Sequence, residues 1–264
     1  MLTRTLEFPA DIDLGESLRW TSVRAATFGR PGRTTRRSPG VGDSWWWAGR
    51  SPDGPVTLLI ESRTGEIDLT AWGPGAEWGL DAAPGLVGFE DDVSTFHPEP
   101  GLVAELHRRN PGLRLGKTGL VFQALIPTIL GQKVTGIEAK RSYRGIVEEY
   151  GERAPGPVDG WIAPSAASLA TLTYADLHPH GVERKRAMVL LEAARRAKRL
   201  EAIVDMARED ALARLTAIRG IGPWSAALVM GSALGDPDAV PVGDYHIPNT
   251  VSYALAGERR GTDA

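Results

Sequence analysis

Residues 215–225 read LTAIRGIGPWS, and this stretch decides the fold. A helix that reaches Ile218 cannot continue through Gly220 and Gly222, because glycine favours turn conformations over helix. Pro223 suits the first position of a new helix, since its φ is fixed near the helical value and its missing N–H costs nothing there. The stretch therefore predicts two helices that are joined by a tight Gly-X-Gly hairpin.

The start of the second helix is also a candidate site for an anion. The first N–H groups of a helix have no partner within the helix, and the helix dipole places positive charge at this end. A phosphate group binds readily in such a place. An ordinary turn between two helices is the alternative, because a Gly-X-Gly sequence alone is a modest signal.

Asp244 follows Gly222 by 22 residues and lies in the segment PVGDYHIP. An aspartate after proline and glycine is commonly the N-cap of a helix. A carboxylate in that position is also held rigidly and kept ionised. Both a capping role and a catalytic role are therefore open for Asp244.

The composition excludes several classes of site. The chain has 264 residues and no cysteine, which rules out disulfides, thiolate zinc sites, a cysteine nucleophile and a cysteine-held iron–sulfur cluster. No apolar run approaches the length of a transmembrane helix, and the first residues lack the apolar core of a secretory signal. We therefore expect a cytoplasmic protein that does not enter the membrane.

The charge differs between the two parts of the chain. Residues 1–100 carry 9 lysines and arginines against 15 acidic residues, whereas residues 101–264 carry 21 against 18. The second part therefore has a mild preference for an anionic partner.

The pattern of residues predicts an α+β protein. Three short strands are predicted, at residues 45–50, 56–62 and 66–72. Turn-forming residues separate them, and the last one alternates apolar and polar residues, which is typical of an antiparallel meander. Within them, the run Trp45–Trp47 invites a ligand-stacking role, but alternate tryptophans in a strand more often pack into the core. From residue 101 onward the pattern is helical, with helices expected at 102–109, 119–130, 134–150, 165–171, 183–199, 204–218, 223–234 and 248–256.

This organisation predicts two domains. Residues 1–100 form a β-rich N-terminal domain, and residues 101–264 form an all-helical region with two lobes and a cleft between them.

Three motifs in order resemble the helix-hairpin-helix DNA glycosylase superfamily. The first motif is GLRL followed by FQALIPTILGQKVTGIEAKR, the second is LTAIRGIGPWSAALVM, and the third is DAVPVGDYHI. The first motif resembles the alkylation-repair branch, the 3-methyladenine DNA glycosylase II type. The resemblance covers residues 101–256, and that branch also carries an antiparallel N-terminal sheet domain.

The resemblance implies a catalytic role for Asp244. In this family, the carboxylate at that position stabilises the positive charge that develops on the deoxyribose when the glycosidic bond breaks. Trp224 matches a position that lines the base pocket, where an indole face favours a cationic base, and packing within the hairpin is the compatible alternative. Tyr245, beside the carboxylate, is a further pocket candidate.

The resemblance also implies the reaction type. Family members that cut the backbone place a Schiff-base lysine where Trp224 stands. No lysine follows Lys198 in this sequence, so we expect base removal without lyase activity. The absence of cysteine excludes the branches that carry an iron–sulfur cluster.

DNA contacts follow from the same resemblance. The backbone amides of the hairpin would bind a phosphate beside the lesion, and the loop after residue 130 would enter the minor groove when the nucleotide flips out. Lys133 stands at the family's apolar wedge position, so Gln132 is the stronger candidate to fill the gap. These DNA-binding residues are Gly220, Gly222, Ser225, Gln132, Lys133 and Thr135.

No cofactor is expected to be required. Hairpins of this family hold a monovalent cation, Na⁺ or K⁺, through main-chain carbonyls, which correspond here to those of Thr216, Ile218 and Ile221.

The end of the chain departs from the family pattern. Only 20 residues follow Asp244, whereas family members add helices that brace the cleft. We expect residues 257–264, GERRGTDA, to be a linker of the kind that leads into such helices.

The sequence therefore predicts a monofunctional DNA glycosylase of base excision repair, working as a monomer at the bacterial nucleoid. Its substrate would be double-stranded DNA with alkylated purines of the 3-methyladenine and 7-methylguanine type. Two alternatives stay open: a glycosylase of the same fold for another damaged base, and a non-catalytic helix-hairpin-helix DNA-binding protein.

Overall fold

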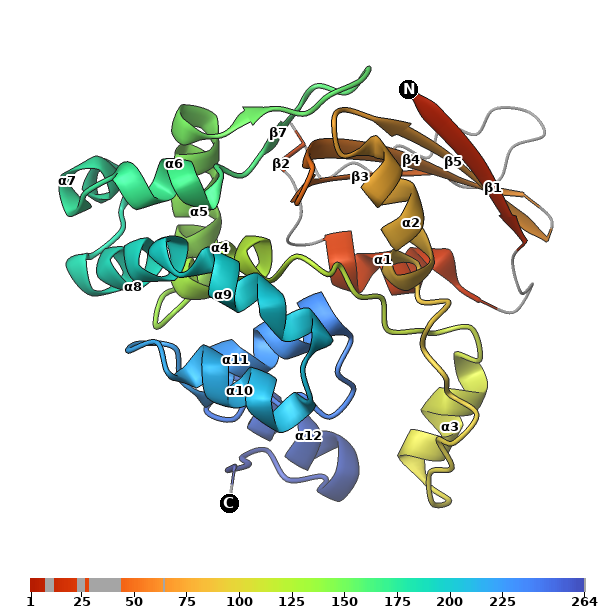
Figure 1. Ribbon diagram of the computed structural model, residues 1–264. Helices are drawn as coiled ribbons and strands as arrows, with labels where there is room; N and C mark the ends of the chain where they lie inside the picture. Colours follow the sequence, from red (N-terminus) through yellow and green to blue (C-terminus); the bar gives the residue numbers. More distant parts are fainter. Residues whose placement is uncertain (8–11, 23–26, 29–43, 64, 264) are drawn as a thin grey trace.

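The computed structural model describes residues 1–7, 12–22, 27–28, 44–63 and 65–263 (Figure 1). An antiparallel sheet and its covering helices occupy one side of the molecule, and a group of short helices occupies the other. No helix in these ranges combines the length and the hydrophobicity that a bilayer crossing requires.

The main sheet has the strand order β1-β5-β4-β3, and all of its neighbouring strands are antiparallel. Its strands are β1 (Leu2–Glu7), β3 (Ser44–Ser51), β4 (Gly54–Arg63) and β5 (Glu66–Trp72). The three-strand meander that the sequence predicts is therefore confirmed. Sequence analysis missed β1, because this edge strand pairs with β5 from the other end of the domain and leaves only a weak local signal.

The tryptophan run of β3 alternates between the two faces of the sheet. Trp47 is buried in a hydrophobic cluster, and Trp45 packs against the same cluster. Trp46 pairs instead with Trp72 of β5, with ring centroids 5.4 Å apart. The expected packing role of alternate tryptophans is therefore confirmed.

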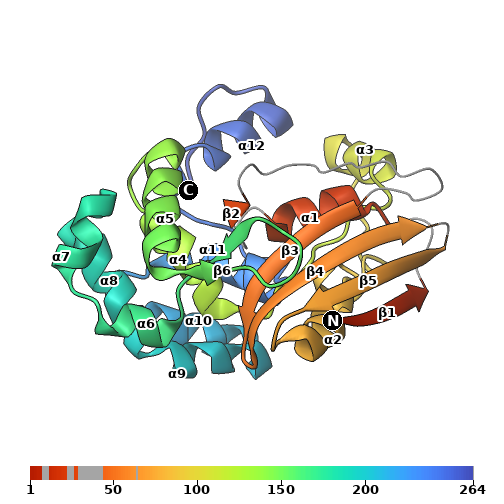
Figure 2. The same cartoon turned by 90° about the horizontal axis from the view of Figure 1, so that it is seen from above.

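Two helices that sequence analysis did not identify, α1 (Leu14–Ser22) and α2 (Ala76–Leu86), pack against one face of this sheet (Figures 1 and 2). A glycine permits the close approach of α2, since a Cβ at Gly79 would lie 2.7 Å from Val56 Cγ2. Helix α2 contains glycine and proline, which are typical of loops and disfavour a helix. Its burial against the sheet stabilises the helical conformation nevertheless.

The remaining helices lie beyond residue 100, and the three short helical turns η1, η2 and η3 lie among them. Every helix that the sequence predicts there is present, although residues 183–199 divide at Arg196 into two helices. The elements are α3 (Leu102–Arg109), α4 (Val121–Leu130), α5 (Gly136–Tyr150), α6 (Ala166–Thr171), α7 (Tyr174–Leu177), η1 (His178–His180), α8 (Arg184–Arg195), α9 (Ala197–Glu201), η2 (Ala202–Asp205), α10 (Arg208–Thr216), α11 (Pro223–Val229), η3 (Met230–Leu234) and α12 (Ile247–Ala256).

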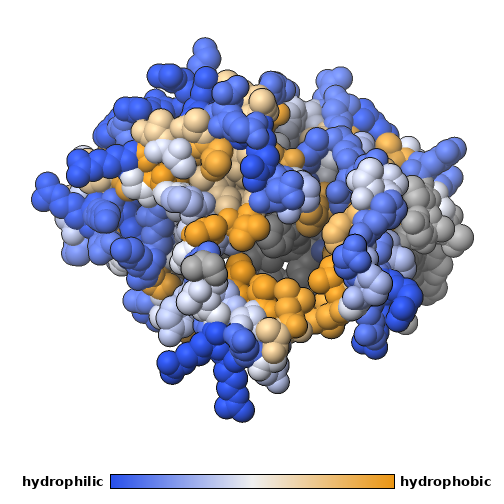
Figure 3. Space-filling model, turned by 90° about the horizontal axis from the view of Figure 1, so that it is seen from below, coloured by the Kyte–Doolittle hydropathy of each residue, from blue (hydrophilic) through white to orange (hydrophobic). Residues whose placement is uncertain are grey.

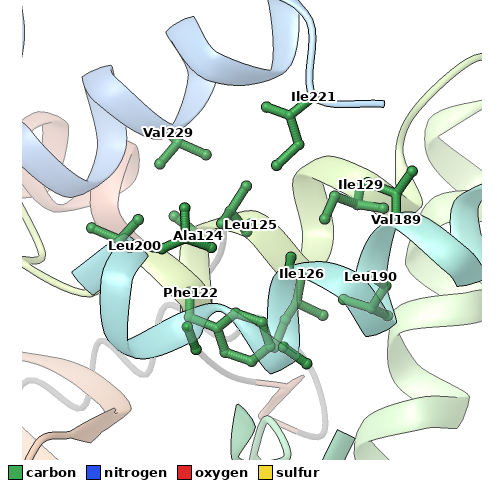
Figure 4. Packing of buried hydrophobic residues seen from close by; sticks show 14 of the residues in the cluster. Phe122, Ala124, Leu125, Ile126, Ile129, Val189, Leu190, Leu200, Ile221 and Val229 are labelled. Carbon is green, nitrogen blue, oxygen red and sulfur yellow. The ribbon is translucent and has the colours of Figure 1, made fainter. Parts of the chain in front are cut away.

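Helix α4 is the centre of the helical core. Its apolar side chains Leu125, Ile126 and Ile129 are fully buried between α8 and α11 (Figure 4). Burial of each such side chain contributes about 1.5–3 kcal/mol. Because α4 contacts both neighbours, its C-terminal end has a fixed position relative to the hairpin between α10 and α11.

The region beyond residue 100 also contains two short strands, which corrects the expectation that it is helical throughout. Strands β6 (Glu152–Arg153) and β7 (Gly160–Ile162) pair with each other, and β7 pairs with β2 (Thr27–Phe28). Such short strands have no detectable period in sequence, and the β2–β7 pairing depends on the tertiary fold. The α+β class itself is confirmed.

Two large hydrophobic clusters divide most of the core along the chain, and a small third one joins Ala48 of β3 to Ala154 and Ile162. The first runs from Leu14 to Leu120 and the second from Val121 to Ala233. The second cluster unites helices from α4 to α11. The predicted domain boundary at residue 100, and the division of the helical region into two lobes with a cleft, stay predictions.

Candidate functional site

The hairpin that the sequence predicts joins α10 to α11. Ile218 and Ile221 are buried in the core cluster and anchor it. Gly220 has φ +101°, and a Cβ at this position would overlap with Val189 Cγ2 of α8. Glycine is therefore required at residue 220 both by the backbone conformation and by the packing against α8.

Gly222 plays a different part in the same hairpin. It is the N-cap of α11 with φ −97°, a value that any residue adopts, and among the described residues only its chain neighbours would lie within 4 Å of a Cβ there. The space beside Gly222 in that direction is therefore open, next to the helix start whose first amides have no partner within the helix. Ser225, two residues into the helix after Pro223, is buried.

Asp244 lies directly beside this hairpin. The indole Nε1–H of Trp224 donates a hydrogen bond of 2.9 Å to Asp244 Oδ2. The backbone amides of His246 and Ile247 donate to Asp244 Oδ1, at 2.8 and 3.0 Å. The N-cap residue of α12 is His246 rather than Asp244, which corrects the capping assignment. The Asp244 carboxylate binds the amides at the helix start from two residues upstream and contacts the hairpin at the same time, so a structural role and a catalytic role are geometrically compatible.

These contacts determine the charge of Asp244. Partial burial by itself would raise the pKa of the carboxyl group. The hydrogen bonds from Trp224, His246 and Ile247 together outweigh this effect and hold the pKa of Asp244 below its ordinary value. Asp244 is therefore an ionised carboxylate at neutral pH.

The loop after α4 is fastened to the hairpin. The side-chain amide of Gln132 donates to the Gly220 carbonyl and to the Ser225 hydroxyl, both at 2.8 Å. The six-membered ring of Trp224 lies against the same loop, since a Cβ at Gly131 would be 3.8 Å from its Cη2 atom. The loop, the hairpin and Asp244 therefore form one connected set.

Two further loop residues were predicted to contact DNA. Lys133 is exposed and has φ +55°, which makes it the one non-glycine residue with a positive φ in the part of the chain that the structure describes. Thr135 is the N-cap of α5, where its hydroxyl and amide form a capping box with Glu138. Thr135 therefore positions the start of α5, and Lys133 extends from the loop toward solvent.

Tyr245 does not join this set. Its side chain is 84% exposed, and its ring meets His246 edge-on with centroids 4.9 Å apart. Other exposed apolar residues lie nearby in the chain at Val242, Val251 and Leu255. Figure 3 views the molecule from the side on which α12 lies and shows hydrophobic side chains around a hollow in that face.

The carbonyls that the sequence suggests for a cation belong to the end of α10 and to the turn that follows it. The Ile218 carbonyl accepts the Ile221 amide at 2.9 Å and keeps one lone pair for a further contact. A Na⁺ or K⁺ held there with the carbonyls of Thr216 and Ile221 would add positive charge beside a bound phosphate. Within the described residues, no cluster of His, Asp or Glu is arranged to hold a metal ion.

Sequence analysis missed one residue that supports the loop. Arg186, in the helix that the sequence predicts at residues 183–199, is buried. Its guanidinium donates to the Leu130 carbonyl at 2.7 Å and to the Gly181 carbonyl at 3.3 Å, which fixes the end of α4. The signal was present, because Arg186 lies three and four residues before Val189 and Leu190 and so shares their helical face.

No protein-family model matches this chain. The DNA-3-methyladenine glycosylase of Bacillus subtilis (strain 168) is 29% identical over 164 residues, which cover 59% of this chain and 53% of the relative. The chain spans about half the length of the curated relatives that it matches.

Solved structures resemble the chain over a greater length. The 3-methyladenine DNA glycosylase from Archaeoglobus fulgidus covers 98% of this chain and 89% of its own, with a TM-score of 0.76 and 20% identity. This chain has the helix-hairpin-helix DNA glycosylase fold. A Clostridium acetobutylicum 8-oxoguanine glycosylase/lyase in complex with double-stranded DNA covers 80% of this chain and 75% of its own, with a TM-score of 0.61 and 17% identity.

These comparisons confirm the resemblance to the glycosylase superfamily that the motifs around Gly220 and Asp244 indicate. Within this glycosylase fold, the hairpin, the loop after α4 and the segment before α12 come from distant parts of the chain and meet at Trp224.

Proposed function

We propose that this protein is a monofunctional DNA glycosylase that hydrolyses the N-glycosidic bond of alkylated purines in double-stranded DNA. The observation that carries the proposal is the ionised carboxylate of Asp244, held against the glycine hairpin by the indole of Trp224. The name of the curated relative, a DNA-3-methyladenine glycosylase, supports the choice of alkylated bases.

Binding would begin at the hairpin and the neighbouring loop. The backbone amides of Gly220, Gly222 and Ser225 would hold a phosphate that flanks the damaged nucleotide. The open space beside Gly222 supports this role, because among the described residues only its chain neighbours would come within 4 Å of a Cβ there. Gln132 and Lys133 would occupy the gap that the flipped nucleotide leaves, which offsets an unstacking cost of a few kcal/mol.

The chemistry then requires one carboxylate. When the bond between C1′ and the base nitrogen breaks, its electron pair leaves with the base, and positive charge develops on the sugar. Asp244 stabilises that charge, and a water oxygen forms the new bond to C1′ while its proton passes to the carboxylate or to solvent. A purine alkylated at N3 or N7 is already cationic, so it leaves as a neutral base without a proton donor.

The absence of lyase activity follows from the residue at position 224. A lyase forms a Schiff base through a lysine amine, and an indole has no nucleophilic amine. We further propose that the protein works as a monomer on DNA, and that it needs neither an iron–sulfur cluster nor another cofactor for this reaction.

A glycosylase for another damaged base is the second candidate. The similarity in fold to an 8-oxoguanine glycosylase/lyase favours it. An oxidised base is neutral, however, and its departure gains more from a proton donor than that of a cationic base. For a cationic alkylated purine, the carboxylate of Asp244 alone therefore suffices. For a neutral oxidised base, the reaction would also gain from a proton donor.

The decisive experiment measures base release. Methylated duplex DNA is incubated with the protein, and free 3-methyladenine and 7-methylguanine are quantified by chromatography, beside an 8-oxoguanine duplex and a borohydride trapping reaction. We expect release of both methylated bases, no trapped Schiff base, and a loss of about 100-fold or more in Asp244→Asn. Asp205→Asn, an exposed aspartate elsewhere in the chain, is the matched control.

Each alternative has its own outcome. Tight binding of DNA with no release of any base would indicate a non-catalytic DNA-binding protein. Release of 8-oxoguanine alone would establish the second candidate, and full activity in Asp244→Asn would remove this carboxylate from the mechanism.

A further inference from the structure

The two oxygens of the Asp244 carboxylate are bound differently. Oδ1 accepts two hydrogen bonds, from the amides of His246 and Ile247. Oδ2 accepts a single hydrogen bond, from the indole of Trp224. An ionised carboxylate offers about four lone-pair positions, so among the described residues these contacts leave one position unused, and it belongs to Oδ2.

The donor to Oδ2 is itself held firmly. Trp224 follows Pro223 at the start of α11, and the next residue, Ser225, is buried and bonded to Gln132. The far edge of the indole lies against Gly131 at the end of α4. The ring is therefore fixed at both ends, with its N–H directed at the carboxylate.

The main-chain donors do not determine the orientation of the second oxygen. Two amides on Oδ1 fix that atom, but the carboxyl plane can still turn about it and move Oδ2. The Trp224 N–H removes this freedom, because it binds Oδ2 alone.

We infer that Asp244 Oδ2 is the oxygen that acts on the reacting sugar, and that Trp224 is the positioning residue that aims it through the indole N–H. This inference rests on the proposed glycosylase function and assigns Trp224 a role beyond lining the base pocket. Geometric misplacement of a catalytic group by about 1 Å can cost about 100-fold in rate. The N–H, rather than the ring face, is therefore the feature of Trp224 on which the rate depends.

Trp224→Phe separates the two roles, since phenylalanine keeps an aromatic face and lacks the N–H. The rate of base release is measured under single-turnover conditions with saturating enzyme, which removes differences in DNA affinity. We expect the rate to fall by about 10- to 100-fold and the acid limb of the pH–rate profile to move to higher pH. Trp161→Phe, on the β6–β7 hairpin, is the matched control for a partly buried tryptophan.

Other charges near Asp244 are the same in every variant. The charge of His246, two residues further along the chain, also lowers the pKa of Asp244, and the Asp263 carboxylate accepts the amide of Gly243. Both are retained, so a movement of the acid limb reports the loss of the indole donor. A positioning role also predicts that Trp224→Phe slows no further an enzyme that already carries Asp244→Asn, whereas an independent stacking role predicts additive losses.

A spectroscopic measurement tests the contact without relying on activity. In ¹⁵N-labelled protein, the indole N–H signal of Trp224 should move as the pH passes through the titration of Asp244, and the movement should be absent in Asp244→Asn. The inference would be overturned if the indole N–H signal stayed unchanged through this titration. It would also be overturned if the rate losses of Trp224→Phe and Asp244→Asn were additive and the acid limb of an active Trp224→Phe enzyme did not move. If the unmodified protein releases no base at any pH, the proposed function fails instead.

Discussion

The same substitution is expected to have different effects at the two glycines of the hairpin. At Gly220 it should lower the stability of the fold, and at Gly222 it should weaken DNA binding. Gly220→Ala introduces a methyl group where φ is +101° and where the new atom would overlap with Val189 Cγ2. Gly222→Ala introduces the same methyl group where φ is −97° and where, among the described residues, only its chain neighbours would lie within 4 Å. The pair therefore separates the structural role of the hairpin from its binding role.

The magnitude follows from these two environments. At Gly220, an unfavourable φ costs about 1–3 kcal/mol and overpacking costs about 1–3 kcal/mol, so we expect the free energy of unfolding to fall by about 2–6 kcal/mol. At Gly222, alanine is a poorer N-cap than glycine but restricts the unfolded chain. These effects nearly cancel, and we expect a change within about 0.5 kcal/mol.

The assays are urea unfolding for stability and titration with methylated duplex DNA for binding. We expect Gly222→Ala to unfold like the unmodified protein and to bind DNA about tenfold more weakly, which corresponds to the loss of about 1.4 kcal/mol at a phosphate contact. A double-mutant cycle with Val189→Ala measures the overlap at Gly220 directly, since the combined loss should be smaller than the sum of the two.

Two results would refute this reasoning. If Gly220→Ala unfolds at the same urea concentration as the unmodified protein, neither the strained backbone nor the contact with Val189 limits this position. If Gly222→Ala binds DNA as tightly as before, the open space beside Gly222 is not the point of approach for a phosphate.

Three further predictions concern side chains. Gln132→Leu removes both hydrogen bonds from the loop to the hairpin and leaves the buried Ser225 hydroxyl without its donor. Urea unfolding should therefore show a loss of about 1–3 kcal/mol in the free energy of unfolding. An unchanged free energy of unfolding would contradict the proposed role of Gln132 in joining the loop to the hairpin. The Glu201 carboxyl group accepts hydrogen bonds from the first amides of α4, and its burial raises its pKa. Its contribution to stability is therefore full below the pKa of the unfolded chain and is lost as pH rises through the raised pKa of the folded protein. The gap in stability between the unmodified protein and Glu201→Gln should therefore be widest in acid and narrow with rising pH in urea titrations, and a constant gap would contradict this account. The lowered pKa of Asp244 has the opposite effect, since its contribution is present above the ordinary aspartate pKa and is lost as pH falls through the lowered value. The melting temperatures of the unmodified protein and Asp244→Asn should accordingly converge in acid, and parallel curves would count against the capping contacts.

Local sequence predicted the elements whose residues interact with near neighbours. The hairpin depends on glycine and proline residues that lie close together in the sequence. These residues alone therefore predict the turn at Gly220–Pro223. The helix that starts after Ser165 and the one that ends at Gly151 also have their caps within the same short segments. The alternation of Trp45–Trp47 is likewise a property of any strand.

Other features escaped sequence analysis because they depend on packing. Helix α2 contains glycine and proline and is stable only where the sheet covers its apolar face. Arg186 is charged, and only the fold reveals that two nitrogens of its guanidinium donate to the carbonyls of Leu130 and Gly181. Tyr245 stands next to Asp244 in sequence but turns toward solvent, since adjacent residues at a helix start point in different directions.

The sequence by itself determined the residue types of the site, which are a glycine hairpin, an indole and a carboxylate in a recognisable order. Only the tertiary structure decided that the indole N–H meets the carboxylate, and that Gln132 reaches the hairpin from far along the chain. The physical reason is that backbone conformation is set mainly by neighbouring residues. A contact between distant side chains depends on how the helices pack around α4, and no short segment of sequence contains that information.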